Sequence, residues 1–175
     1  MTVTIKKAVL RDASWITAYL RPLDHEECFC QLPGGTTTAM LAHAFVHTGN
    51  SYIAYRGDEP VMLFGTSPIN AACFSVWAVG TKRTPRVIPA VSRFYLDYEI
   101  PARLAEGFRT AEARSLLSHE AAHRWMVSLG AEQIGDPFPY GKADEHFVLY
   151  RWTVAGYRAI REKSRWSVPD VPVRQ

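Results

Sequence analysis

The N-terminal half of the chain changes between the two-residue period of strands and the three-to-four-residue period of helices. Residues 2–9 alternate apolar and polar side chains, which predicts a half-buried first strand. Two helices with one apolar face are expected next, followed by three strands that form an antiparallel meander. The predicted helices cover residues 14–21, ended by Pro22, and 38–47, and the predicted strands cover residues 51–56, 61–66 and 72–79.

The C-terminal half begins with a long apolar-periodic segment at residues 87–104, which predicts a helix that Pro101 kinks or stops. A strand, a short helix and a closing strand are expected after it. The helix is amphipathic, can be capped by Ser118 and stops at Gly130. These elements cover residues 108–117, 118–130 and 146–154, with turns before the closing strand, a basic helix at 157–165 and an extended tail at 168–175.

This order of elements predicts one mixed α/β (α+β) domain over residues 1–154, with residues 155–175 added as a basic helix and a proline-containing tail. The 175 residues can bury a full core, and 47% hydrophobic with 21% charged residues is ordinary globular composition. No apolar run has the length of a membrane span, and the N-terminus lacks an apolar signal centre, so a protein that stays inside a cell is expected.

Three cysteines, Cys28, Cys30 and Cys73, show no repeated spacing, which predicts free and mostly buried thiols. His25 near the first pair matches no common zinc pattern. The net charge of +3 is too small to indicate nucleic-acid binding, although clustered cations leave nucleic acid open as a partner.

The helix at residues 118–130 contains His119-Glu120-x-x-His123, the spacing by which two histidines on one helix face bind zinc. Such a site needs a third ligand, and neither Glu145 nor His146 lies in a partner motif. His119 also falls at the start of the helix, and the charged Arg124 follows the motif. We therefore expect no metal site, and we expect both histidines to lie on the helix surface.

The order of elements over most of residues 1–154 resembles the GNAT superfamily, the Gcn5-related N-acetyltransferases. The resemblance implies a mostly antiparallel central sheet flanked by helices, and a coenzyme A pyrophosphate held by the loop after the fourth strand. That loop is Gly80-Thr-Lys-Arg-Thr-Pro-Arg. The cofactor-binding residues implied for acetyl-CoA are Val79, Gly80, Lys82, Arg83 and Arg86.

Several positions depart from the pattern that the resemblance implies. The loop has only Gly80 where the family has more glycines, and Pro85 removes one N–H donor. His119 and Met126 stand where the family has an asparagine and a catalytic tyrosine, and residues 72–79 contain no glutamate that could act as the base. We therefore predict a degenerate coenzyme site, no catalytic residue and no bound cofactor, with acetyl-CoA as the cofactor of the alternative, an active N-acetyltransferase. A zinc hydrolase is the third hypothesis.

A narrower resemblance rests on Trp77-x-x-Gly80 with its basic loop, and on Arg124-Trp125-Met126 before Gly130-Ala131. These segments are similar to the GNAT-like internal virion proteins of short-tailed bacteriophages. The resemblance implies a structural role in the virion, or in the cytoplasm of the infected host. Phage particle proteins or further copies of the chain are the expected partners of residues 155–175, with four apolar anchors in the tail. These anchors are Trp166, Val168, Val171 and Val173.

Overall fold

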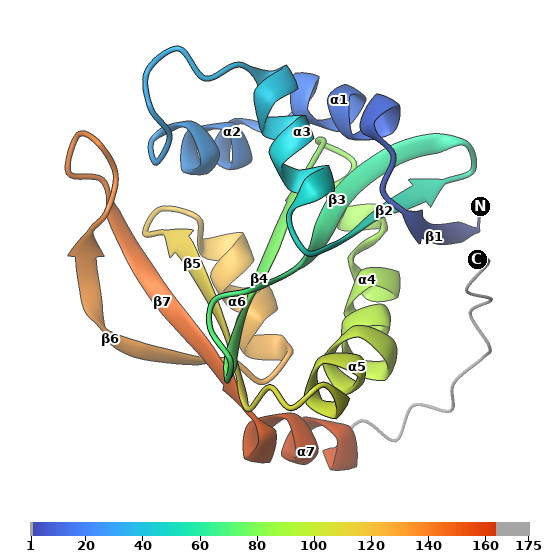
Figure 1. Ribbon diagram of the computed structural model, residues 1–175, viewed down its shortest axis with the longest axis vertical. Coiled ribbons are helices and arrows are strands. Elements are labelled where there is room, and N and C mark those ends of the chain that lie inside the picture. Colours follow the sequence, from blue (N-terminus) through green and yellow to red (C-terminus); the bar gives the residue numbers. More distant parts are fainter. Residues whose placement is uncertain (1, 164–175) are drawn as a thin grey trace.

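A computed structural model describes residues 2–163 of the chain, and its centre is a seven-stranded sheet with the strand order β1-β2-β3-β4-β5-β7-β6 (Figure 1). The strands are β1 Val3–Lys7, β2 Asn50–Arg56, β3 Glu59–Pro68, β4 Cys73–Gly80, β5 Thr110–Leu116, β6 Glu132–Pro139 and β7 His146–Thr153. All neighbours pair antiparallel except β4 and β5. The predicted mixed fold and its meander of β2, β3 and β4 are confirmed.

Seven α-helices, a short 3-10 turn and a π-helical segment surround this sheet within the described residues (Figure 1). They are α1 Leu10–Ala18, α2 Pro22–Phe29, α3 Thr38–His47, the 3-10 turn Thr84–Arg86, α4 Ile88–Phe94, the π segment Tyr95–Glu99, α5 Ile100–Ala105, α6 Glu120–Ser128 and α7 Val154–Lys163. None of the helices within residues 2–163 is long and apolar enough to cross a membrane.

The helices cover opposite faces of the sheet because their apolar stripes face different strand residues. Helices α1 and α3 bury Ile16 and Ala42 against Leu63 on one face. On the other face α4 buries Val91 against the meander, while Met126 of α6 packs against the C-terminal strands. The sheet is therefore covered on both sides at its centre, where β4 and β5 meet.

Strands β4 and β5 pair only over a short stretch, Cys73 to Ser75 against Thr110 to Glu112. Beyond this stretch the two strands diverge, so their carboxyl ends lie apart in the middle of the sheet (Figure 1). The backbone groups that face the gap lack ladder partners, and other groups must satisfy them. The candidate functional residues lie at this open end.

The first two helices differ from the sequence prediction. Helix α1 begins at Leu10, directly after the extended Val9, which provides no side-chain cap, and it ends at Ala18. Pro22 does not simply end that helix; it opens α2, where its fixed φ suits the first turn and its missing N–H is not needed.

The predicted long helix is confirmed as the continuous run of α4, the π segment and α5. The π segment turns Tyr95 and Glu99 toward the sheet, and both side chains are fully buried or nearly so. The Tyr95 hydroxyl contacts the carbonyl oxygens of Gly65 and Trp77 at 3.2 and 3.0 Å. Pro101 falls in the first turn of α5, where proline is tolerated.

Glu99 anchors this long helix to the meander through a cluster of buried side chains. Its carboxylate accepts hydrogen bonds from the hydroxyls of Tyr52 at 2.9 Å and Thr66 at 2.5 Å, and the Arg103 guanidinium lies 3.5 Å away. Lys7 donates in turn to the Tyr52 hydroxyl at 3.0 Å, and burial lowers the pKa of its ammonium group. The buried charge of Glu99 is therefore fully partnered.

Strand β6 lies in a region where the sequence predicted only turns. It is the outer strand of the sheet and pairs with β7 on one side, with an irregularity between Ile134 and Phe138. Pro137 and Pro139 fit there because an edge strand has N–H positions that no neighbour needs. Strand β7, predicted as the closing strand, is confirmed but lies between β5 and β6.

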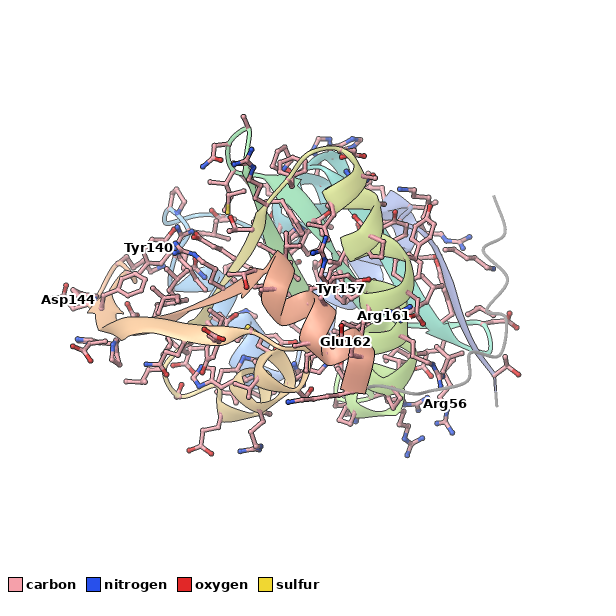
Figure 2. All side chains as sticks on the ribbon, turned by 90° about the horizontal axis from the view of Figure 1, so that it is seen from below. Arg56, Tyr140, Asp144, Tyr157, Arg161 and Glu162 are labelled. Carbon is pink, nitrogen blue, oxygen red and sulfur yellow. The ribbon has the colours of Figure 1, made fainter. Side chains whose placement is uncertain are left out.

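Helix α7 packs against its own domain rather than projecting from it. The Tyr157 hydroxyl donates to the Leu96 carbonyl at 2.8 Å, and Arg161 forms an ion pair with Asp97. Figure 2 shows Tyr157 and Arg161 on the side of α7 that faces the α4–α5 helix. The four predicted tail anchors lie outside the described residues, so partner binding through the tail stays a prediction.

Candidate functional site

A cavity of about 440 Å³ lies between the diverging strands at the centre of the sheet. It is lined by β4 residues such as Trp77 and Val79, and by Ala113 and Ser115 of β5. Its floor includes Trp125 of α6. The cavity wall is mostly apolar, with a few polar groups near the strand ends, which is the composition of many ligand sites.

Helix α2 crosses the open end of the gap, and its Asp24 side chain is hydrogen-bonded to the end of β4. The Asp24 carboxylate accepts the Gly80 N–H at 2.7 Å and is also held by Arg21, whose Nε lies 2.8 Å away. Asp24 is only 2% exposed. A buried charge held by a guanidinium and a backbone N–H forms strong, directional hydrogen bonds. Asp24 therefore occupies the Gly80 N–H at the end of β4, which could otherwise donate to a neighbouring strand or to a bound anion.

Glu27, one helical turn further along α2, does the same for β5. Its Oε2 accepts from the Ser115 hydroxyl and the Leu116 N–H, each at 2.8 Å. His119 Nδ1 lies 3.1 Å from the same oxygen, and its Nε2 lies 3.5 Å from the Asp24 carboxylate. His119 thus contacts both acidic residues, and the cluster of Asp24, Glu27 and His119, which we call the clasp, spans the gap between the two strands.

The backbone of the loop after β4 has few N–H groups left for a phosphate. Beyond Gly80, the N–H of Thr81 bonds to the Val61 carbonyl at 3.0 Å, and that of Arg83 to the Thr81 hydroxyl at 3.3 Å. The next donors are used within tight turns: Thr84 to Thr81, Arg86 to Arg83 and Val87 to Thr84. Pro85 and Pro89 have none, so only Lys82 and Ile88 keep an N–H without a protein acceptor in this described stretch.

Gly80 is also required for packing. A Cβ at this position would lie 2.0 Å from Thr84 Oγ1 and 3.1 Å from the Val61 carbonyl oxygen. The glycine therefore lets the 3-10 turn close onto β4. Its presence needs no bound phosphate to explain it.

The five residues predicted to hold a cofactor do not line one common cavity in the described part of the chain. Val79 and Gly80 are buried, and Val79 lines the cavity. Lys82, Arg83 and Arg86 are exposed, and Arg83 pairs with Glu59 of β3. Lys82 and Arg83 line a second cavity beside α1, away from the gap between the strands.

The two histidines of the zinc-like motif face protein groups. The expectation that both lie on the surface is wrong for His119, which is 3% exposed within the clasp. His123 Nε2 donates to the Leu116 carbonyl at 3.0 Å, and burial lowers the pKa of this imidazole. Glu120 pairs with Arg124 on the exposed side of α6. Among the described residues no group of three or more potential ligands has the geometry to hold a metal ion.

The cavity offers weak candidates for acid–base chemistry. Met126, at the position of the family's tyrosine, is buried and cannot transfer a proton. Cys28 lines the cavity, but burial raises the pKa of its thiol far above neutrality, which disfavours the nucleophilic thiolate. Burial also raises the pKa of the Tyr95 hydroxyl well above its usual value. Among the described residues, Glu27 is the one carboxylate that lines this cavity.

Asp24, Glu27 and His119 were not singled out together from the sequence. They are separated by up to 95 positions, so no local spacing indicates their contact. The one available signal was the pair of acids at positions i and i+3 of a short helix, which places both on one face.

A parallel β4–β5 junction that opens inside a mostly antiparallel sheet, with helices on both faces, is the arrangement of the GNAT fold, and the chain has that fold. Its neighbours among solved structures are acetyltransferases. A protein provisionally described as an acetyltransferase has a TM-score of 0.71 at 14% identity, over 92% of this chain and 88% of that one.

Two further structures with this fold come from named organisms. An N-acetyltransferase from Staphylococcus aureus has a TM-score of 0.66 at 12% identity, over 89% of this chain and 99% of that one. A GNAT-family acetyltransferase from Streptococcus pneumoniae has a TM-score of 0.60 at 15% identity, over 87% and 99%. No protein-family model matches the chain. No curated protein matches it either.

Proposed function

We propose that this chain uses the GNAT fold as a structural or assembly component, with a coenzyme A site that has degenerated. The observation that carries this proposal is the buried Asp24 carboxylate on the Gly80 N–H. A pyrophosphate at this loop would lie close to the Asp24 carboxylate, and most of the backbone N–H groups of the loop already have an acceptor. Like charges at close range disfavour binding by several kcal/mol in a poorly solvated site.

The alternative is an active acetyl-CoA-dependent N-acetyltransferase, and one observation favours it. The cavity between β4 and β5 persists at about 440 Å³, although a purely structural domain could fill that space with side chains. Acceptor amine and coenzyme arm could both enter such a gap. Glu27 would then be the nearest carboxylate to serve as a base.

The assembly role rests on the resemblance to internal virion proteins and on the basic C-terminal region. Arg158 and Lys163 on α7 are exposed, and four further apolar residues follow in the tail. We propose phage particle proteins or further copies of this chain as the partners of residues 155–175, and the virion or the infected host cytoplasm as the location. Portal, tail or internal-core genes beside this gene would support the role, and a metabolic operon would contradict it.

Calorimetry with acetyl-CoA tests the proposed loss of the coenzyme site. Adenosine 3′,5′-bisphosphate, which lacks the pantetheine arm, is the matched ligand. We expect acetyl-CoA to bind no more tightly than the bisphosphate and to undergo no amine-dependent loss of its thioester. Tighter binding of acetyl-CoA that Ala113→Leu abolishes by filling the cavity, together with thioester turnover, would establish the enzyme instead.

A further inference from the structure

Two exposed aromatic rings on α1 line the second cavity, which lies between the end of that helix and the loop after β4. Trp15 and Tyr19 are 47% and 57% exposed, and their ring centroids lie 4.3 Å apart. The opposite side of α1 supplies the residues of this helix that enter the core, such as Ile16. Two adjacent exposed rings that the fold itself does not need indicate an interaction surface.

The opposite wall of this cavity is positively charged. Lys82 extends from the loop, and none of the described carboxylates forms an ion pair with it. Arg83 beside it pairs with the partly exposed Glu59. A single carboxylate needs only a side-chain cation such as Lys82, whereas a pyrophosphate needs several backbone donors, most of which have acceptors in this loop. The cavity therefore suits a ligand with flat apolar groups and one carboxylate.

The end of the chain has this chemistry in its sequence. Residues 168–173, which lie outside the described part of the structure, read Val-Pro-Asp-Val-Pro-Val. Pro169 and Pro172 are three residues apart, with Asp170 between them. Prolines at this spacing favour the polyproline II helix, whose three residues per turn place both rings on one face. Such segments dock into grooves lined by aromatic side chains and lose little conformational freedom on binding.

We propose that the tail of one copy of this chain docks into the second cavity of another copy. The inference rests on the proposed binding of residues 155–175 to further copies, and it names the surface that receives them. The proline rings pack on Trp15 and Tyr19, and the Asp170 carboxylate pairs with the Lys82 ammonium group. When each copy gives its tail to the other, the exchange closes a symmetric dimer in which both cavities are filled.

The tail of the same copy is too short to reach this cavity. Helix α7 packs against the α4–α5 helix, whereas α1 covers the opposite side of the sheet, and Figure 1 shows α7 and α1 at opposite ends of the molecule. Pro169 is six residues from Lys163, where α7 ends. Six extended residues span about 20 Å, and a path to the outer side of α1 must pass the sheet and two helical layers, each about 10 Å thick.

Sedimentation equilibrium of the full-length protein measures the dissociation constant of the expected dimer. Trp15→Ala combined with Tyr19→Ala should raise this constant about tenfold or more, because buried aromatic side chains contribute much of the binding energy at interfaces. Pro169→Ala combined with Pro172→Ala should raise it too, since the tail loses both rings and its conformational restriction. Trp15 and Tyr19 are exposed, so circular dichroism should show that the first double variant is folded.

A mixture of the two double variants tests whether the contact joins different copies. Neither variant alone has both an intact tail and an intact cavity, so each should be monomeric at concentrations at which the unchanged protein dimerises. Their equimolar mixture should associate more strongly than either component, because the tail of one variant meets the cavity of the other. A mixture that associates no more than its components overturns the exchange of tails between copies.

Charge reversal tests the pairing of Asp170 with Lys82. Each of Lys82→Glu and Asp170→Lys alone should raise the dissociation constant about threefold, and both changes in one chain should restore dimerisation. Tyr140→Ala and Lys142→Glu are the matched controls, since both residues are exposed and neither lines this cavity. The controls should leave the dissociation constant unchanged. Equal effects of control and test variants would contradict docking at this cavity.

The remaining outcomes separate this inference from the proposed function. A protein that stays monomeric at all concentrations overturns the exchange of tails, while the loss of the coenzyme site is tested independently with acetyl-CoA. If the tail variant dissociates and the cavity variant does not, binding through residues 155–175 stands and this cavity is not the surface that receives them. A dimer that persists in both variants uses another interface and overturns the inference.

Discussion

The molecule contains two buried carboxylate clusters that hold its structure together in different ways. The Glu99 cluster lies under the π segment, where β2 and β3 already pair along their length, and it fixes a helix to that continuous surface. The clasp lies where β4 and β5 have separated, and its carboxylates accept the N–H groups of Gly80 and Leu116.

This difference shows how a sheet can tolerate a gap at its centre. The groups that bond to Glu99 are side chains of Tyr52 and Thr66, and the backbone of their strands is already paired. The Glu99 cluster therefore fixes the position of a helix that apolar packing already holds against the sheet. In the clasp, acidic side chains of α2 replace hydrogen bonds that a neighbouring strand would otherwise make. The first cluster should therefore govern global stability, and the second should govern the local stability of the gap.

Glu99→Ala should produce the largest loss of stability. The change leaves the hydroxyls of Tyr52 and Thr66 without their buried acceptor and leaves Arg103 with less compensating charge. Removal of one partner from a buried ionic cluster typically destabilises a protein by about 3–5 kcal/mol. Urea unfolding measures the change. A loss no larger than that of Glu120→Ala, which breaks an exposed pair, would contradict the structural role of Glu99.

Asp24→Ala should cost less, about 1.5–3 kcal/mol, the usual value of hydrogen bonds to a charged group. Arg21 is partly exposed and can be solvated after the change, whereas the Gly80 N–H loses a buried acceptor. Hydrogen exchange should accelerate most in α2 and at the end of β4. A uniform rise in hydrogen exchange over the whole sheet would contradict the claim that the clasp stabilises only the gap between β4 and β5.

The smallest expected effect is a dependence of stability on pH, and it comes from His123, which lies beside the clasp and donates to the Leu116 carbonyl. Burial lowers the pKa of this imidazole in the folded protein, so folding favours the neutral form. The stabilisation is present above the ordinary histidine pKa of about 6.5 and is lost as the pH falls through it. Stability measured by urea unfolding should therefore decline from about pH 7.5 to pH 5. His123→Gln should flatten part of this decline, and an unchanged slope would contradict the assignment.

The sequence predicted those elements whose side chains alternate or recur with a clear period. The long helix with Val91 and Tyr95 follows from its helical period, since it buries one face. The meander follows from short apolar runs bounded by turn residues, and its strands β2 and β3 are buried on both faces. Strand β6 was missed because nearly all its residues are exposed, so it has no apolar alternation, and because Pro137 and Pro139 suggest turns.

The candidate site was harder to predict than the fold. The basic loop could be located, but the acceptors of its N–H groups come from other segments, as Asp24 does for Gly80. The same holds for His119, whose burial depends on α2 packing across the gap. Local spacing contains no information on such pairings, because they form only when the tertiary structure brings distant segments together.

The π segment Tyr95–Glu99 has a consequence for which insertions and deletions the gene can tolerate. A π turn contains one residue more than the α-helical turn that it replaces. Deletion of one residue there would restore ordinary α-helical turns and would change the spacing that directs both Tyr95 and Glu99 toward the sheet. Glu99 would then leave the position in which it accepts hydrogen bonds from Tyr52 and Thr66. Reading-frame-preserving deletions should accordingly be selected against in this segment even where single substitutions, as at the exposed Tyr98, are neutral.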